Sequence, residues 1–253
     1  MARLSVCIPT RNRAAFVLKA AESVLGQTFS DLSVVIVDNA STDDTPRVLE
    51  NLRARDPRIE VHRNDRDLGM VGNWNRCLEL ASGEFFALLM DDDLWWPETA
   101  ARAVAALEAR PRAAFVHAAC CVVDGAGNEV GLHRPHARDL VLDGRRFVRM
   151  AMLRGNVVAP PTVVARLDAV RRAGPFRDDY GIAADLDLWL RLAGQGEVVY
   201  LAEPLASYRI HAGNVSGSVD SARTVADVWR LLHDAATRSG TWALGRAEVD
   251  LKV

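Results

Sequence analysis

The sequence predicts an α/β fold built on a mostly parallel sheet. Three β-α units follow one another from the N-terminus, each pairing a short apolar strand with a segment of helix length. A fourth apolar run, from Phe85 to Met90, lacks alternation, as expected of a strand buried on both faces. The chain has 253 residues, of which 49% are hydrophobic and 25% charged, so it can bury one large core.

The first half is expected to hold four strands. The first runs from Leu4 to Ile8 and stops at Pro9. The elements expected after it are a helix at 14–25, a strand at 32–37, a helix at 46–55, a strand at 59–62, a helix at 70–80, the strand at 85–90 and a helix at 97–110 opened by Pro97.

The second half changes in character. We expect a strand at 113–123 that forms a hairpin with 129–132, followed by a polar loop at 133–139 and a helix at 144–153. Next come a strand that is approached through prolines and ends at Arg166, a helix at 167–173, a loop at 176–182 and a helix over 184–192. Strands at 198–201 and 205–210 and a terminal helix at 221–237 complete the chain's expected elements.

Three aspartates, Asp91, Asp92 and Asp93, directly follow the fourth strand. Ligands of open α/β sheets gather at the carboxyl ends of strands. Adjacent carboxylates repel one another unless a cation compensates, and Mg²⁺ or Mn²⁺ prefers oxygen ligands. The run therefore indicates a metal site, and the alternative is a solvated acidic turn before a helix.

Two more strand ends carry polar residues that suit a nucleotide. The loop at 10–13 follows the first strand, and Asp38 follows the second, where a carboxylate can accept from a base N–H or a ribose hydroxyl. Asp38 could instead only order the turn. Neither G-x-G-x-x-G nor G-x-x-x-x-G-K-[ST] occurs, which argues against dinucleotide oxidoreductases and P-loop enzymes.

Composition excludes several classes of protein. The net charge of −2 gives no reason to expect nucleic acid or an anionic membrane as partner. No apolar segment approaches the roughly 20 residues of a membrane span, and no signal peptide is expected before the first strand. The four cysteines lack C-x-x-C spacing and predict reduced thiols in a cytoplasmic protein. His133 and His136 are interpreted as loop residues, not metal ligands.

A second acidic pair, Asp185 and Asp187, opens the late helix. The helix dipole favours negative charge in a first turn, so these residues could have no chemical role. The alternative is that one or both carboxylates have a chemical task.

Taken together, these motifs resemble the family 2 glycosyltransferases over nearly the whole chain. The matching segments are SVCIPTRNR at 5–13, VIVDNASTDDT at 35–45, residues 69–75, residues 81–84 with the aspartates at 91–93, and DLDLWLR at 185–191. Their order and spacing carry the resemblance. The chain departs from the family pattern at Arg11, Asn39 and Ala184, where relatives often have tyrosine, aspartate and glutamate.

The resemblance implies a GT-A fold, with a Rossmann-like central sheet flanked by helices and a smaller mixed sheet on the acceptor side. It implies a single domain, with a nucleotide-sugar half at 1–110, an acceptor and catalytic-base half at 111–215 and a helical segment at 216–253. The implied activity is inverting sugar transfer from a UDP- or dTDP-sugar with Mn²⁺ or Mg²⁺. The acceptor would be a saccharide, a natural product or a lipid-linked molecule, and a homodimer is possible.

The resemblance also implies roles for individual residues. Pro9, Thr10, Arg11 and Asn12 would line the base, Asp38 would meet the base or ribose, and Asn64, Gly69 and Asn73 would lie where a loop closes over the nucleoside. Within the acidic run, Asp92 would approach the ribose or sugar, Asp93 would hold the metal, and Asp91 has no separate task. Asp185 matches the catalytic base, with Asp187 the alternative. His211 matches a position that can approach the metal or diphosphate, and the alternative for His211 is a capping or core role.

Two other functions stay open at this point. Because the glutamate before Asp185 is missing, the chain could be a catalytically silent subunit that binds nucleotide sugars. A nucleotidyltransferase would share the α/β nucleotide half but usually has a glycine-rich first loop, which is absent here.

Overall fold

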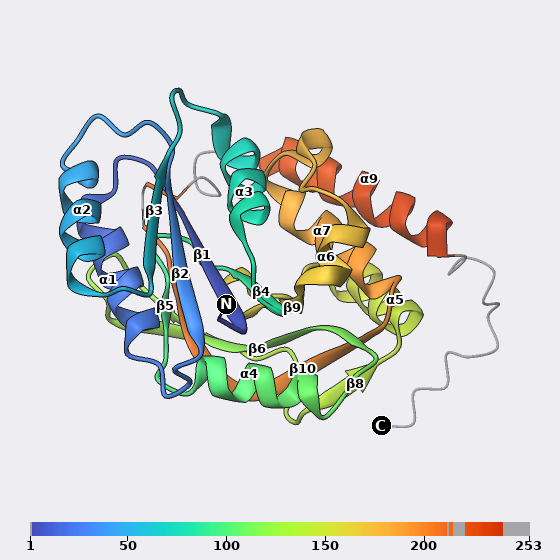
Figure 1. Cartoon of the computed structure of the whole chain (residues 1–253). Coiled ribbons are helices and arrows are strands. Elements are labelled where there is room, and N and C mark those ends of the chain that lie inside the picture. The colour runs from blue at the N-terminus through green and yellow to red at the C-terminus, as the bar shows by residue number, and fades with distance from the viewer. Residues whose placement is uncertain (1, 212, 215–220, 240–253) are drawn as a thin grey trace, which may run out of the picture.

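The computed structural model describes residues 2–211, 213–214 and 221–239. Over these residues the chain forms three layers, with a central sheet between two groups of helices (Figure 1). The strand order is β3-β2-β1-β4-β9-β6-β10-β5, with β7 paired to β6 and β8 paired to β10. The predicted α/β architecture is confirmed.

The first half contributes four neighbouring parallel strands, because β3, β2, β1 and β4 all run in the same direction. Its elements are β1 (Leu4–Thr10), α1 (Ala14–Leu25), β2 (Leu32–Asp38), α2 (Thr45–Arg55), β3 (Ile59–Arg63), α3 (Gly69–Leu80), β4 (Phe85–Leu88), β5 (Leu94–Trp95) and α4 (Thr99–Glu108).

The second half continues the same sheet. Its elements are β6 (Ala113–Val123), β7 (Glu129–His133), β8 (Leu140–Leu142), α5 (Gly144–Arg154), the 3-10 turn η1 (Pro160–Thr162), β9 (Val164–Arg166), α6 (Leu167–Ala173), the 3-10 turn η2 (Asp178–Ala183), α7 (Ala184–Ala193), β10 (Glu197–Arg209) and α9 (Ser221–Ser239). Strand β9 is antiparallel to both β4 and β6 and joins the halves. The strands expected in a separate acceptor-side sheet are therefore an extension of the central one.

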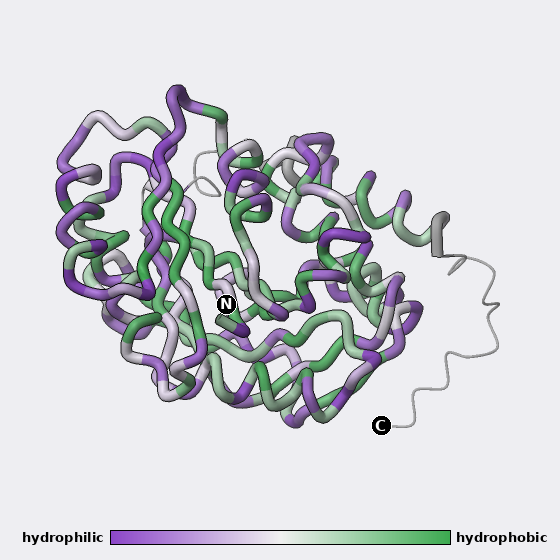
Figure 2. Tube along the Cα trace, viewed as in Figure 1, coloured by the Kyte–Doolittle hydropathy of each residue, from purple (hydrophilic) through white to green (hydrophobic). Residues whose placement is uncertain are grey.

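Two hydrophobic clusters cover the two faces of the sheet. Because successive strand residues point to opposite faces, Val6 and Ile8 pack with α1, α2 and α4, whereas Cys7 packs with α3, α5, α6, α7 and α9. Figure 2 shows the apolar strands at the centre of the molecule and polar residues on the outer helix surfaces. The unbroken apolar runs in the sequence reflect this burial on both sides.

Some predicted element boundaries are wrong. Strand β1 continues through Pro9 to Thr10, since Pro9 faces the side on which β4 has already ended, so its missing N–H leaves no ladder bond unmade. Helix α4 begins at Thr99 and not at Pro97, because the preceding residues form β5 against β10. The two strands expected over 198–210 are one strand with register shifts around Pro204.

The remaining differences are small. Strand β8, which pairs with β10 directly after the loop expected at 133–139, was not predicted. The hairpin of β6 and β7 is confirmed, and the terminal helix extends to Ser239. The rest of the predicted segment 216–253 lies outside the described residues. No helix in the described ranges combines the length and the apolar character that crossing a membrane requires.

Candidate active site

A cavity of about 410 Å³ opens at the carboxyl ends of β1, β2 and β4. It brings together residues from distant parts of the chain, as expected at this edge of an α/β sheet. The predicted site residues that line it are Pro9, Thr10, Arg11, Gly69, Asn73, Asp91, Asp92, Asp93 and Asp185. The predicted residues that do not line it are Asn12, Asp38, Asn64, Asp187 and His211.

The loops after β1 and β2 are locked to each other beneath the cavity. Asn12 has a positive φ of 54°, and its side-chain oxygen accepts from the Thr42 N–H at 2.7 Å while its own N–H donates to Ser41 Oγ at 2.9 Å. Asp38 is 1% exposed and accepts from the Ser41 N–H and from Arg63. Asn12 and Asp38 thus shape the loops and do not face the cavity.

A buried amide network holds the third loop, which follows β3. Asn64 Nδ2 donates to Asn39 Oδ1 at 3.0 Å and to Asn73 Oδ1 at 2.9 Å. Asn39 also donates to Asp67 at 2.6 Å, and its Oδ1 accepts from the Leu68 N–H. Each of these amide groups forms a hydrogen bond with the next one, so the network fixes Asn73 and Gly69 at the cavity wall.

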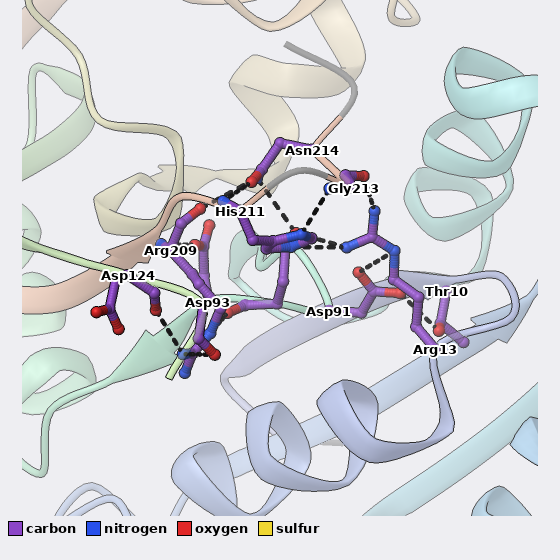
Figure 3. A network of polar contacts seen from close by, with 11 residues as sticks. Thr10, Arg13, Asp91, Asp93, Asp124, Arg209, His211, Gly213 and Asn214 are labelled. Carbon is purple, nitrogen blue, oxygen red and sulfur yellow. Dashed lines mark hydrogen bonds and ion pairs between the residues drawn. The ribbon is translucent and has the colours of Figure 1, made fainter. Parts of the chain in front are cut away.

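The acidic turn after β4 is buried and only partly paired (Figure 3). Asp91 accepts from the Thr10 hydroxyl at 2.7 Å, and Asp92 accepts from Arg13 at 2.7 Å. Burial raises the pKa of Asp91 to about 7, with the negative charge of Asp92 adding to the rise and Thr10 opposing it. Burial, reinforced by Asp92, also raises the pKa of Asp93 well above its usual range.

A bound cation would supply the partner that one carboxylate oxygen of Asp93 lacks. Its Oδ1 accepts from the Arg209 N–H at 2.9 Å, whereas its buried Oδ2 has no hydrogen-bond partner among the described residues. An orphaned carboxylate oxygen in this setting is costly unless it meets a positive charge. In the described part of the chain, no group of three or more His, Cys, Asp or Glu side chains is arranged to hold a metal by itself. Because the protein offers only one or two carboxylates here, the site suits Mg²⁺ or Mn²⁺, whose other ligands are phosphate oxygens and water.

Two arginines brace the acidic turn, and the sequence analysis assigned a role to neither. Arg209 is 4% exposed, donates through Nε to the Asp92 carbonyl at 3.0 Å and so holds the turn against β10. Arg13 joins Asp92 to the segment after β10 by donating to the Gly213 carbonyl at 2.6 Å. His211 Nε2 lies 3.0 Å from Asp92 Oδ2, so the structure places this histidine beside Asp92.

Asp185 lies on another wall of the cavity, at the start of α7. It is 8% exposed, and its Oδ1 accepts from the Leu186 N–H at 2.7 Å. Burial raises its pKa to about 6, and the backbone N–H opposes that rise. Asp185 is therefore ionised at neutral pH and has a pKa close to that of an effective general base.

Asp187 points away from the cavity. Its side chain is fully buried, and Oδ2 accepts from Arg191 at 2.9 Å. Arg191 also donates to the carbonyl of Pro175 at 2.8 Å, so this pair ties α7 to the loop before η2. Of the two aspartates only Asp185 lines the cavity, whereas Asp187 holds α7 against the preceding loop through Arg191.

Replacing Asp187 by alanine should lower the free energy of unfolding by about 3 kcal/mol or more, because it leaves a buried guanidinium without its carboxylate. Urea denaturation would measure this loss. The matched control is Asp168→Ala, which removes an exposed i,i+4 pair with Arg172 and should cost less than about 1 kcal/mol. A stable Asp187→Ala protein without activity would return Asp187 to a catalytic role.

The cavity also contains residues that the sequence analysis did not select. They are Arg13, Asn39, Asp67, Met70, Trp74, Met90, Pro160, Ile182, Tyr208 and Asn214. Asn39 directly follows Asp38 at the end of β2, and Arg13 belongs to the same loop as Arg11, so the strand-end argument could have found both. Tyr208 and Asn214 come from β10 and the residues after it, and the match at His211, which lies between them, could have pointed to both.

Comparison with known proteins identifies the family. Residues 5–165, which include β1 to β9 and the acidic turn, match the description "Glycosyl transferase family 2". The chain belongs to this family. The GalNAc(5)-diNAcBac-PP-undecaprenol beta-1,3-glucosyltransferase of Campylobacter jejuni is 37% identical over 130 residues, which cover 51% of this chain and 41% of that protein.

Solved structures agree in fold. S. aureus TarS 1–349 in complex with UDP-GlcNAc superposes with a TM-score of 0.75 at 20% identity, covering 92% of this chain and 66% of that one. The mannosyltransferase PcManGT of Pyrobaculum calidifontis, in complex with GDP-Man and Mn²⁺, has a TM-score of 0.65 at 18% identity, covering 96% of this chain and 76% of that one. The predicted GT-A fold is confirmed. The chain spans less than two thirds of both the Campylobacter protein and TarS 1–349.

Proposed function

We propose that the chain transfers a sugar, with inversion, from a nucleoside diphosphate sugar such as a UDP- or dTDP-sugar to an acceptor hydroxyl. One observation carries the proposal: a single cavity has the acidic turn at 91–93 on one wall and the carboxylate of Asp185 on another. This arrangement supports a donor diphosphate at the first wall and a base at the second. The TarS complex with UDP-GlcNAc and the PcManGT complex with GDP-Man and Mn²⁺ have the same fold, which adds support.

The bond changes assign a task to each wall. The acceptor oxygen attacks the anomeric carbon, and a new C–O bond forms as the bond from that carbon to the diphosphate oxygen breaks. The acceptor proton passes to the carboxylate of Asp185, and the nucleoside diphosphate leaves with the electron pair. Base catalysis of this kind is typically worth roughly 10²–10⁴-fold in rate.

Asp93 is the residue proposed to hold a divalent ion, through its orphaned Oδ2, with Asp91 or Asp92 beside it. A bound Mg²⁺ or Mn²⁺ ion would neutralise the negative charge of the leaving diphosphate. Arg209 keeps Asp93 in place through its backbone N–H. The network of Asn39, Asn64 and Asn73 keeps the third loop against the nucleoside side of the cavity.

Incubation with UDP- and dTDP-sugars, Mn²⁺ and a panel of acceptors tests the proposal. Released nucleoside diphosphate together with a glycosylated acceptor is the expected result. Released pyrophosphate would indicate nucleotidyl transfer, and tight nucleotide binding without turnover would indicate a silent binding subunit; either result contradicts the proposal. The cytoplasmic location and the homodimer expected from the sequence stay predictions.

The rate of transfer should depend on pH through Asp185. Since the base must be ionised and burial raises its pKa to about 6, kcat/KM should level off above pH 7 and decline below about 6, by about tenfold per unit. A pH profile with saturating Mn²⁺ measures this limb. The limb should be absent from the residual rate of Asp185→Asn, and a wild-type profile that stays flat to pH 5 would argue against Asp185 as the base.

A further inference from the structure

A second cavity, of about 420 Å³, adjoins the first. The two cavities share four lining residues, namely Pro160, Ile182, Asp185 and Tyr208. Asp185 therefore lies where the two cavities meet, and a molecule in the second cavity can bring a hydroxyl to this carboxylate. The volume lies within the roughly 300–1,000 Å³ typical of small-molecule sites.

The second cavity has mostly apolar walls. Its other apolar lining residues come from β6, the segment before η1, η2, α7 and α9, and they are Val122, Val158, Ala159, Ala183, Leu186 and Val228. Cys120 completes this wall, and burial raises the pKa of its thiol to about 12. A neutral buried thiol behaves as a small apolar group, so this wall has little to offer a polar ligand.

His133 and Asn156 also line the second cavity, and each has a polar atom within hydrogen-bond distance of the backbone. His133 Nε2 lies 3.1 Å from the Val157 carbonyl oxygen, and Asn156 Oδ1 accepts from the Val158 N–H at 3.0 Å. A sugar in this cavity would place several of its hydroxyls against valine, leucine and isoleucine side chains. Burying a hydroxyl without a partner costs free energy, whereas burying hydrocarbon is favourable.

We propose that the second cavity binds an apolar group of the acceptor, an aryl or branched alkyl substituent next to the hydroxyl that receives the sugar. The inference rests on the function proposed above and specifies its acceptor class. The substituent packs against Val122 and Val228, and the hydroxyl lies at the junction beside Asp185. An acceptor made only of saccharide leaves these walls without an apolar partner.

Calorimetry on the chain loaded with UDP and Mn²⁺ tests the proposal without requiring turnover. The probes are glucose and N-acetylglucosamine, each compared with its phenyl glycoside. The phenyl glycosides should bind at least about tenfold more tightly than the parent sugars, as expected for burial of an aromatic ring. Equal affinities would overturn the proposal.

Variants assign the effect to the cavity. Val122→Asn and the isosteric Val228→Thr should each reduce the phenyl preference, with Val228→Thr covering the case in which the first variant folds poorly. The matched control is Val130→Asn on β7, which is 55% exposed outside the cavity and should keep the preference. The proposal would also be overturned if neither cavity variant reduced the phenyl preference. The same holds for a lipid-linked saccharide that binds wild type and both variants with equal affinity.

The test also separates this inference from the proposed function. Sugar transfer is followed independently, by release of UDP and by product formation. A chain that transfers sugar but shows no phenyl preference retains the proposed function and refutes the apolar acceptor group. A chain that shows the preference but never turns over keeps the binding site and refutes the transferase proposal.

Discussion

Asp185→Asn should lower kcat for sugar transfer by roughly 10²–10⁴-fold and leave the affinity for UDP nearly unchanged. Asparagine preserves the size of the side chain, and its Oδ1 can still accept from the Leu186 N–H that now binds Asp185. It cannot take the acceptor proton at neutral pH. Steady-state kinetics and calorimetry with UDP and Mn²⁺ measure the two quantities separately.

The matched control is Asp178→Asn in η2, a neighbouring exposed aspartate outside both cavities. It should retain wild-type kinetics. Because burial raises the pKa of Asp185, its replacement should not destabilise the fold, and a normal melting temperature shows that lost activity is not lost structure. Wild-type transfer by Asp185→Asn would remove this residue from the role of base.

Asp93→Ala should abolish the part of UDP affinity that depends on Mn²⁺. Substituting residues that merely support a metal ligand typically costs 10–100-fold in metal affinity, and loss of the ligand itself should cost at least about that much. Affinity for UDP measured without metal should change little. Calorimetric titrations with and without Mn²⁺ give the comparison.

Although substituting Asp93 should weaken metal-dependent UDP binding, it should stabilise the metal-free fold. Asp93 is buried with a raised pKa, so at neutral pH its carboxylate is unfavourable in the metal-free fold. Asp93→Asn retains an oxygen for the Arg209 N–H, and it should raise the melting temperature without metal while losing metal binding. Asp44→Asn, at an exposed position before α2, is the control for both measurements. Metal dependence that survives in Asp93→Ala would contradict the assignment.

The sequence determined the nucleotide side of the site because its residues follow strands directly. Parallel strands end at the same edge of the sheet, so the loops after Ile8, Val37 and Met90 had to meet, and Asp91, Asp92 and Asp93 had to lie among them. Apolar runs and β-α alternation were enough to predict this part of the fold. Local chemistry also predicted the hairpin of β6 and β7, in which turn residues separate two strand patterns.

The choice between Asp185 and Asp187 needed the tertiary structure. Residues two apart on a helix point in widely different directions, since each residue turns by about 100°. Which of the two faces the cavity depends on how α7 packs against its neighbours. The same holds at the end of β2, where Asp38 is buried against Arg63 and Asn39 lines the cavity.

The tertiary structure alone also revealed the groups that come from distant elements. Arg209 and Tyr208 reach the site from β10, which runs beside β6 and not beside β1 or β4. The second cavity collects side chains from β6, β7, α7, β10 and α9 and from the segments between them, and no spacing along the chain encodes that meeting. Sequence order thus determined which residues lie at the strand ends, whereas packing decided which of the two carboxylates faces the cavity and which apolar side chains line the second cavity.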